Sequence, residues 1–146
     1  MTSADRSNLE RFVTAQAPVF ESVLAELRAG RKRTHWMWFV FLQLSGLGQS
    51  STARFYGVSS IDEARAYLAH PLLGPRLDLC TRIVLTSESS SLHAIFGSPD
   101  DMKFQSCMTL FSLATDDADN PFRHALDRWC GGRPDDQTLT LIDAGG

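Results

Sequence analysis

Apolar side chains recur along this 146-residue chain at helical spacing, three or four positions apart. The clearest stripes are Val19, Val23, Leu24 and Leu27, and then Phe104, Cys107, Met108 and Phe111. No segment shows the strict polar and apolar alternation of a half-buried strand. The pattern predicts one compact all-α domain of about eight short helices over residues 1–146, without a sheet. Residues 1–6 and 143–146 are predicted to be flexible ends.

Start and stop signals divide the chain into these helices. Ser7 and Ser60 each stand three residues before a glutamate, which is the pattern of a capping box. Ser98-Pro99 and Asn120-Pro121 combine a capping side chain with a proline suited to a first helical position. Gly30 is placed where a helix ends in the left-handed conformation.

The segment Trp36–Leu42 is apolar at all seven positions, so periodicity does not distinguish a buried helix from a strand. Because no other segment offers a partner strand, we predict a buried helix capped by Thr34. The segment is far shorter than the roughly 20 residues that cross a bilayer.

Basic side chains gather within eight positions around the start of this segment: Arg28, Arg31, Lys32, Arg33 and His35. Backbone N–H groups at a helix N-terminus favour a phosphate or carboxylate, and cationic side chains add charge. The rings of Trp36 and Trp38 could stack on a base or a sugar. The alternative is a solvated basic loop beside tryptophans of the core, and charge runs are more often of this kind.

A second polar segment follows Ser98-Pro99. Asp100, Lys103 and Cys107 fall along one side of the helix predicted there, and Ser106 lies three positions beyond Lys103. A lysine can activate a serine or cysteine nucleophile, although the order here reverses the known S-x-x-K signature. The alternative is an ordinary surface pair of Asp100 with Lys103 beside a packed cysteine.

The composition narrows the possible functions. Hydrophobic residues make up 43% and charged residues 21%, which is typical of a globular domain, and the net charge of -3 disfavours binding of nucleic acid by bulk charge. Of 14 cations, 12 are arginines and only Lys32 and Lys103 are lysines. The three cysteines form no metal-ligand spacing with each other or with histidine, so no metal is expected. The odd number of cysteines and the polar N-terminus, which does not resemble a signal peptide, indicate a cytoplasmic protein.

Beyond these patterns, much of the chain resembles one known family. The likeness is carried by Leu9-Glu10-Arg11-Phe12, Arg31–Phe39, Tyr56-Gly57, His70–Gly74, Phe96–Lys103 and Gly131–Asp135. These stretches resemble the uncharacterised, mostly bacterial domain of unknown function 1810, sometimes labelled calpastatin-like. Where the family pattern has Phe-Pro-Gln, this chain has Leu42 in place of the proline. The resemblance implies a small all-α domain with no established activity and no assigned cofactor.

The family pattern also selects polar positions that a helical core does not need, beside aromatic ones, and these are candidates for a shared pocket. The charge and rings of the basic and aromatic run favour an anionic, nucleotide-like small molecule as its ligand. The candidate ligand-binding residues are Lys32, His35, Trp36, Trp38, Gln43 and Lys103. The candidate catalytic residues are His35, Lys103 and Ser106, and the sequence leaves open whether any reaction takes place. One alternative is a protein-interaction domain whose charged rim is the loop of Asp116, Asp117 and Asp119. Another is weak nucleic-acid binding through Arg28–Arg33. No membrane partner is expected, and the sequence gives no oligomeric state.

Overall fold

The computed structural model describes residues 2–48 and 50–144, with side chains from residue 9 onward. In this part of the chain there are ten α-helices and one short 3-10 helix, and no strand; Leu44 and Val58 form an isolated parallel bridge. The helices are α1 (Thr2–Gln16), α2 (Phe20–Arg28), α3 (Met37–Val40), α4 (Ser51–Phe55), α5 (Ile61–Ala69), α6 (Leu73–Leu85), α7 (Leu92–Phe96), α8 (Asp100–Ala114), α9 (Pro121–Cys130) and α10 (Asp136–Asp143), with η1 at Ser45–Leu47. The all-α prediction is confirmed.

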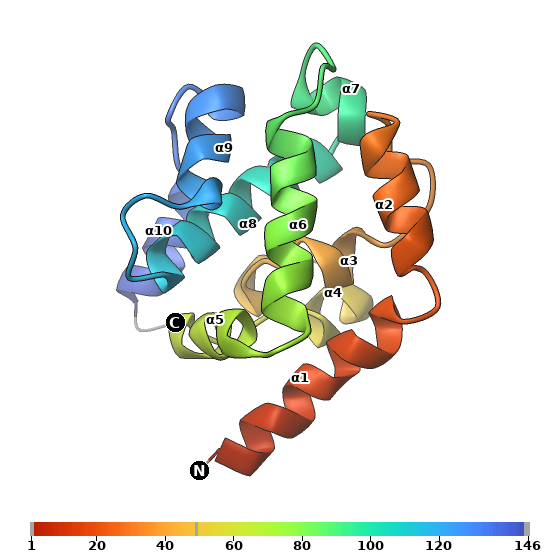
Figure 1. Cartoon of the computed structure of the whole chain (residues 1–146). Coiled ribbons are helices and arrows are strands. Elements are labelled where there is room, and N and C mark those ends of the chain that lie inside the picture. The colour runs from red at the N-terminus through yellow and green to blue at the C-terminus, as the bar shows by residue number, and fades with distance from the viewer. Residues whose placement is uncertain (1, 49, 145–146) are drawn as a thin grey trace.

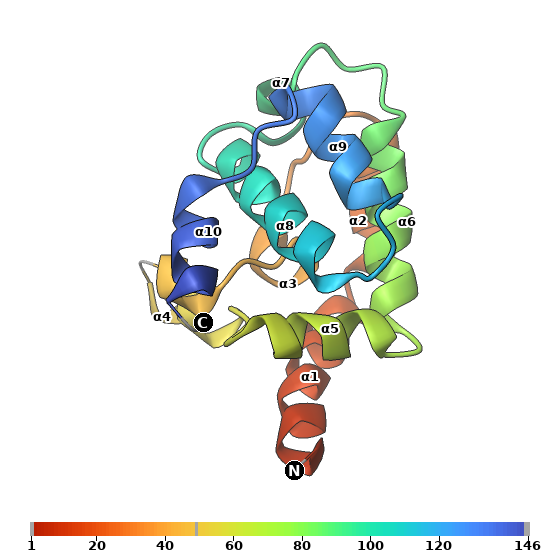
Figure 2. The same cartoon turned by 90° about the vertical axis from the view of Figure 1, so that its left-hand side faces the viewer.

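Helix α8 lies at the centre of the fold. It packs against α5, α7, α9 and α10, while α6 packs against α2, α5 and α9. Figure 2 shows α8 in the middle of the molecule with these helices around it, and in both views α1 extends away from the body towards its N-terminal end (Figures 1 and 2). Of the helices described here, none is both long and apolar enough to cross a membrane.

The central position of α8 explains why it is buried on more than one face. The predicted inward stripe from Phe104 to Phe111 is confirmed, and Ser106 and Thr109 are buried as well. Burying a hydroxyl is costly unless it is hydrogen-bonded. Ser106 Oγ donates to the carbonyl of Met102 at 3.2 Å, and Thr109 Oγ1 donates to the carbonyl of Gln105 at 2.9 Å. The helix backbone thus satisfies both groups.

Several terminal signals act as the sequence predicts. Ser60 accepts a hydrogen bond from the backbone N–H of Glu63, and Asn120 accepts one from that of Arg123. Gly30 has a positive φ of 75°, a conformation that glycine adopts without steric cost. The short helix α7, capped by Ser91, was not predicted because five residues are too few to show a periodic stripe.

Other predictions of helix starts are wrong. Helix α1 begins at Thr2, so Ser7 lies inside it, and the residue that precedes α8 is Pro99 rather than Ser98. Thr34 does not cap α3, which follows Trp36 with no side-chain cap. The ends predicted to be flexible fall partly outside the described residues, which begin at residue 2 and stop at residue 144.

The corner between α5 and α6 depends on the absence of a side chain at Gly74. A Cβ at this position would lie 2.1 Å from the backbone carbonyl oxygen of Leu68. Gly74→Ala should therefore destabilise the protein by about 3 kcal/mol in a denaturant titration, because only a backbone shift relieves the overlap. Gly131→Ala is the comparison: φ is +63° and ψ is 28° there, in the left-handed region, and no atom lies within 4 Å, so only backbone strain of about 1 kcal/mol is expected. Equal costs for the two variants would contradict this account.

Candidate functional site

The loop between α2 and α3 is folded around the carboxylate of Glu26. Oε1 accepts hydrogen bonds from the backbone N–H groups of Arg33 at 2.7 Å and Thr34 at 3.0 Å, and from the indole N–H of Trp36 at 3.0 Å. Oε2 accepts the hydroxyl proton of Thr34 at 2.7 Å. The N–H groups predicted to hold an external anion are therefore bound to a carboxylate of the protein itself, and α3 is only four residues long.

These hydrogen bonds decide the ionisation of Glu26. Burial alone would raise the pKa of the carboxyl, because a charged group is less stable away from water. The hydrogen bonds from Arg33, Thr34 and Trp36 outweigh that effect and lower the pKa to about 2. Glu26 is thus an ionised anchor for the loop at neutral pH.

Lys32 is the member of the basic run that turns inward. Its backbone N–H donates to the carbonyl of Ile95 at 2.7 Å, which ties the loop to α7. Its side chain is 9% exposed, and its Nζ lies 3.0 Å from Asp100 Oδ2 and 5.3 Å from the ring centroid of Trp36. By contrast, the neighbouring residues Arg31 and Arg33 are exposed. The run therefore separates into one buried cation and an outer group.

The second lysine of the chain reaches the same carboxylate from α8. Lys103 Nζ lies 3.5 Å from Asp100 Oδ1 and 5.5 Å from the ring centroid of Trp38. The side chains of Asp100 and Lys103 are 19% and 26% exposed, so the group is partly shielded from water. Lys32, Asp100 and Lys103, which we call the lysine–aspartate triad, carry one net positive charge.

A small cavity opens beside the triad, with Lys103 in its wall. Its accessible volume is only about 10 Å³, which is about the room that one water molecule needs. Its apolar wall is formed by Met37, Phe41 and Ala53, and the remaining lining by Trp38, Gln43, Tyr56, Gly57 and Lys103. Among the residues that the structure describes, the Gln43 side-chain amide has no hydrogen-bond partner. The cavity thus combines aromatic surface with one cation and one polar amide.

Backbone contacts hold the side of the cavity formed by Gln43 and Gly57. The N–H of Val58 donates to the carbonyl of Gln43 at 3.0 Å, and Arg11 donates to the carbonyl of Gly57 at 2.9 Å. A Cβ on Gly57 would lie 2.4 Å from Ser45 Cα, so the two segments approach more closely than a side chain permits. The position of Gln43 is therefore set by the backbone around it.

Packed aromatic rings support the other side. Phe41, Phe96 and Phe104 form a mutual cluster with ring centroids 5.0–5.7 Å apart. At Leu42, where the family pattern has proline, the chain leaves α3 without one: the helix ends at Val40, and Phe41 is non-helical with φ −107° and ψ 86°. Leu42 is fully buried, so its side chain is part of the core.

The structure brings together five of the six predicted ligand-binding residues. Trp38, Gln43 and Lys103 line the cavity, Lys32 reaches Lys103 through Asp100, and Trp36 is a buried ring beneath Lys32. The sixth, His35, is exposed and outside the lining.

Ser106 and Cys107 also lie apart from the cavity lining. The Ser106 hydroxyl is bonded to the carbonyl of Met102, and Cys107 is fully buried. Burial raises the pKa of the Cys107 thiol well above its usual value, so the idea that Lys103 activates this cysteine is wrong.

Sequence reasoning missed two parts of the site. The sequence predicts an ion pair between Asp100 and Lys103, three residues apart, and the structure contains it. The sequence does not predict the second pair, between Asp100 and Lys32. Tyr56 lines the cavity, and the only sign of it in the sequence was its place in the family pattern. Both features depend on residues that are far apart in the sequence, so no local pattern predicts the Lys32–Asp100 pair or the place of Tyr56 at the cavity.

Comparisons with known proteins match nearly the whole chain. The family model described as "Protein of unknown function (DUF1810)" matches residues 6–142. The chain belongs to this family. A similar solved structure is that of the conserved hypothetical protein Rv1873 from Mycobacterium tuberculosis, with 56% identity and a TM-score of 0.90, covering 93% of this chain and 96% of that one. No curated protein matches.

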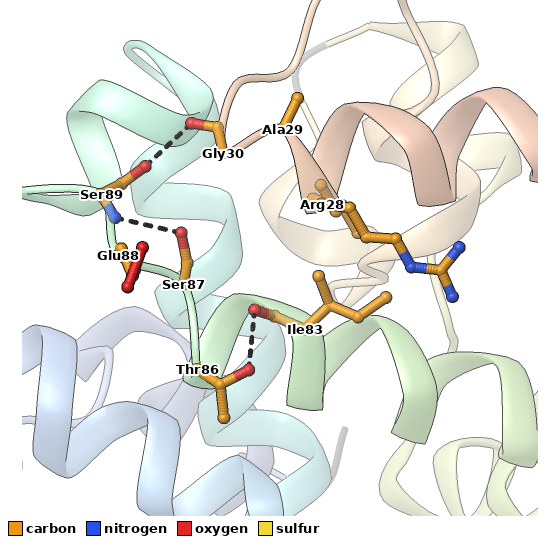
Figure 3. Close-up of a pocket in the computed structure, with 9 residues that line it drawn as sticks. Arg28, Ala29, Gly30, Ile83, Thr86, Ser87, Glu88 and Ser89 are labelled. Atoms are coloured by element: carbon orange, nitrogen blue, oxygen red, sulfur yellow. Dashed lines mark hydrogen bonds between the residues drawn. The ribbon is translucent and has the colours of Figure 1, made fainter.

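Larger depressions elsewhere on this DUF1810 chain are more open. Figure 3 shows one between the end of α2 and the segment after α6, where Arg28 extends away from Glu88 and Ser89. Its hydroxyl groups are used internally: Ser89 Oγ donates to the carbonyl of Gly30 at 3.0 Å. Across the described residues, no group of three or more His, Cys, Asp and Glu side chains is placed to hold a metal ion.

The anchoring role of Glu26 predicts a pH-dependent contribution to stability. Its pKa in the folded protein lies below the unfolded value of about 4.3. The carboxylate therefore stabilises the fold above about pH 4.5, and this contribution is lost as the pH falls towards 2. Glu26→Gln should lower the free energy of unfolding at pH 7 by on the order of 1 kcal/mol, since water screens the partly exposed group. The gap to the wild type should shrink at pH 3.

Glu21→Gln is the matched control, because Glu21 is an exposed glutamate on the same helix. Urea titrations of the three proteins at both pH values make the comparison. A Glu26→Gln variant as stable as the wild type at pH 7, or a gap that is unchanged at pH 3, would contradict the anchoring role.

Proposed function

We propose that this domain binds a small anionic molecule of the nucleotide class at the cavity beside the lysine–aspartate triad. The observation that carries the proposal is the convergence of Lys32 and Lys103 on one carboxylate next to a cavity lined by Trp38. Two cations from distant parts of the sequence are thereby held 3.0 Å and 3.5 Å from the oxygens of Asp100.

The charge of the triad supports an anionic ligand. Two lysines and one aspartate leave one net positive charge in a partly buried place, where charges interact more strongly than in water. Arg31 and Arg33 on the loop beside Lys32 add exposed positive charge. A phosphate group accepts hydrogen bonds from several ammonium protons at once, so it suits two neighbouring lysines.

The aromatic surface supports a ligand with a flat ring. Trp38 and Tyr56 line the cavity, and Phe55 contacts Tyr56 with ring centroids 4.9 Å apart while remaining 58% exposed. A base or nicotinamide-like ring can stack on such surfaces. The cavity has room for about one water molecule, far below the 300 Å³ or more that encloses a whole ligand. The ligand's ring would therefore lie against the aromatic side chains at its mouth.

We propose binding rather than catalysis. The titratable groups at the cavity and triad are Lys32, Asp100, Lys103 and Tyr56, and three of these are tied to one another as ion pairs. Activation of a nucleophile needs an adjacent base within hydrogen-bond reach. Ser106, whose hydroxyl is bonded to the carbonyl of Met102, does not supply that arrangement.

The test is isothermal titration with adenosine monophosphate, adenosine and inorganic phosphate. Adenosine monophosphate should bind most tightly, because it alone offers both a ring and a phosphate. Lys103→Met should weaken its binding by roughly tenfold or more, since a hydrogen-bonded charge contributes about 1.5–3 kcal/mol. Trp38→Leu should weaken it by a similar factor, because it removes the stacking surface.

Arg65→Met is the matched control, because Arg65 forms an ion pair of the same three-residue spacing with Asp62, at 3.3 Å, on the exposed face of α5. It should bind adenosine monophosphate as the wild type does. If Lys103→Met and Arg65→Met bind it equally well, or if the wild type binds none of the three compounds, the proposed function is wrong.

A further inference from the structure

The triad has an internal anion at its centre. Asp100 places one carboxylate oxygen on each lysine, Oδ2 at 3.0 Å from Lys32 Nζ and Oδ1 at 3.5 Å from Lys103 Nζ. This is the arrangement by which two oxygens of an external phosphate would meet the same two ammonium groups. Asp100 thus stands where the charged end of an anionic ligand would be most strongly attracted.

The two lysines have supports that do not involve Asp100. Lys32 lies over the Trp36 ring at 5.3 Å, and Lys103 lies over the Trp38 ring at 5.5 Å. The backbone of Lys32 is also bonded to the carbonyl of Ile95. An ammonium over an aromatic face is attracted to the ring, so each lysine keeps this contact when the carboxylate is removed, while its need for an opposite charge is left unmet.

An internal carboxylate changes which anions the lysines accept. A ligand with one negative charge that replaces Asp100 exchanges one ion pair for an equivalent one and gains little. A phosphate monoester with two negative charges matches both lysines and gains more than it displaces. The geometry therefore favours dianions over carboxylates.

We propose that the position of the Asp100 carboxylate between Lys32 and Lys103 is the anion subsite of the proposed binding site. Asp100 occupies it as an internal competitor, and this selects phosphate monoesters over singly charged anions. The inference rests on the proposed function, and it adds the ligand's charged group and the residue that discriminates it.

The neighbouring residue provides a matched control. Asp101 is also in the first turn of α8, but its carboxylate has other partners: Oδ2 lies 3.5 Å from Nδ1 of His93, and Oδ1 accepts the backbone N–H of Met102 at 2.9 Å. Asp100→Ala and Asp101→Ala each remove one acidic group from the same helix turn. Only the first should change the subsite.

The experiment measures binding of inorganic phosphate and of acetate at pH 8 and constant ionic strength, by isothermal titration, after each variant is shown to be folded by circular dichroism. The wild type and Asp101→Ala should bind phosphate weakly and acetate not measurably. Asp100→Ala should bind phosphate at least tenfold more tightly and should bind acetate as well. Asp100→Asn keeps the size of the side chain and should move in the same direction, so the test does not depend on one variant folding.

Two results separate the inference from the proposed function. If Asp100→Ala and Asp100→Asn bind phosphate no better than Asp101→Ala, or if the wild type binds acetate as well as phosphate, the proposal that Asp100 is an internal competitor is wrong. In that case adenosine monophosphate can still bind at the cavity, and the titration with that compound decides separately whether the proposed function is correct. If no variant binds phosphate and the wild type does not bind adenosine monophosphate, both proposals fail.

Discussion

The carboxylate of Glu26 holds the loop on which the arrangement of the site depends. The chain between α2 and α3 has no regular structure that could position its basic residues, and its polar backbone groups need partners. Glu26 supplies them by accepting the N–H groups of Arg33 and Thr34 and the indole N–H of Trp36. The backbone N–H of Lys32 is bonded to the carbonyl of Ile95, and the two residues that follow are bonded to Glu26. Because the backbone is fixed in this way, the Lys32 side chain is directed into the molecule, where it reaches Asp100.

Burial of Lys32 then imposes a second constraint, because a shielded ammonium needs an opposite charge. Asp100 meets that need from the first turn of α8, the helix at the centre of the fold. The same carboxylate draws Lys103 to the edge of the cavity, where Trp38 lies beneath it. The loop, the central helix and the aromatic segment are thus joined through one triad.

Local signals in the sequence account for most of the helices and for part of the site. Caps such as Asn120 act within three residues, and the stripe along α8 reflects a period of the same size, so both can be read without the fold. Thr34 was misread because its hydroxyl is bonded to Glu26, eight residues earlier, rather than to the helix it precedes. Asp100 was read as a partner of Lys103 alone, since nothing in the sequence brings residue 32 to residue 100. The contacts that make the site are long-range, and the sequence marks their members only through the family pattern.

The scarcity of lysine gives the central claim a direct measurement. With only Lys32 and Lys103 in the chain, ¹³C labelling of lysine at its ε-carbon alone yields two signals by nuclear magnetic resonance. If both cations bind one ligand beside Trp38, both signals shift along the same titration curve when adenosine monophosphate is added, and adenosine alone does not move them together. Signals that stay in place, or that respond equally to the uncharged nucleoside, would contradict the account.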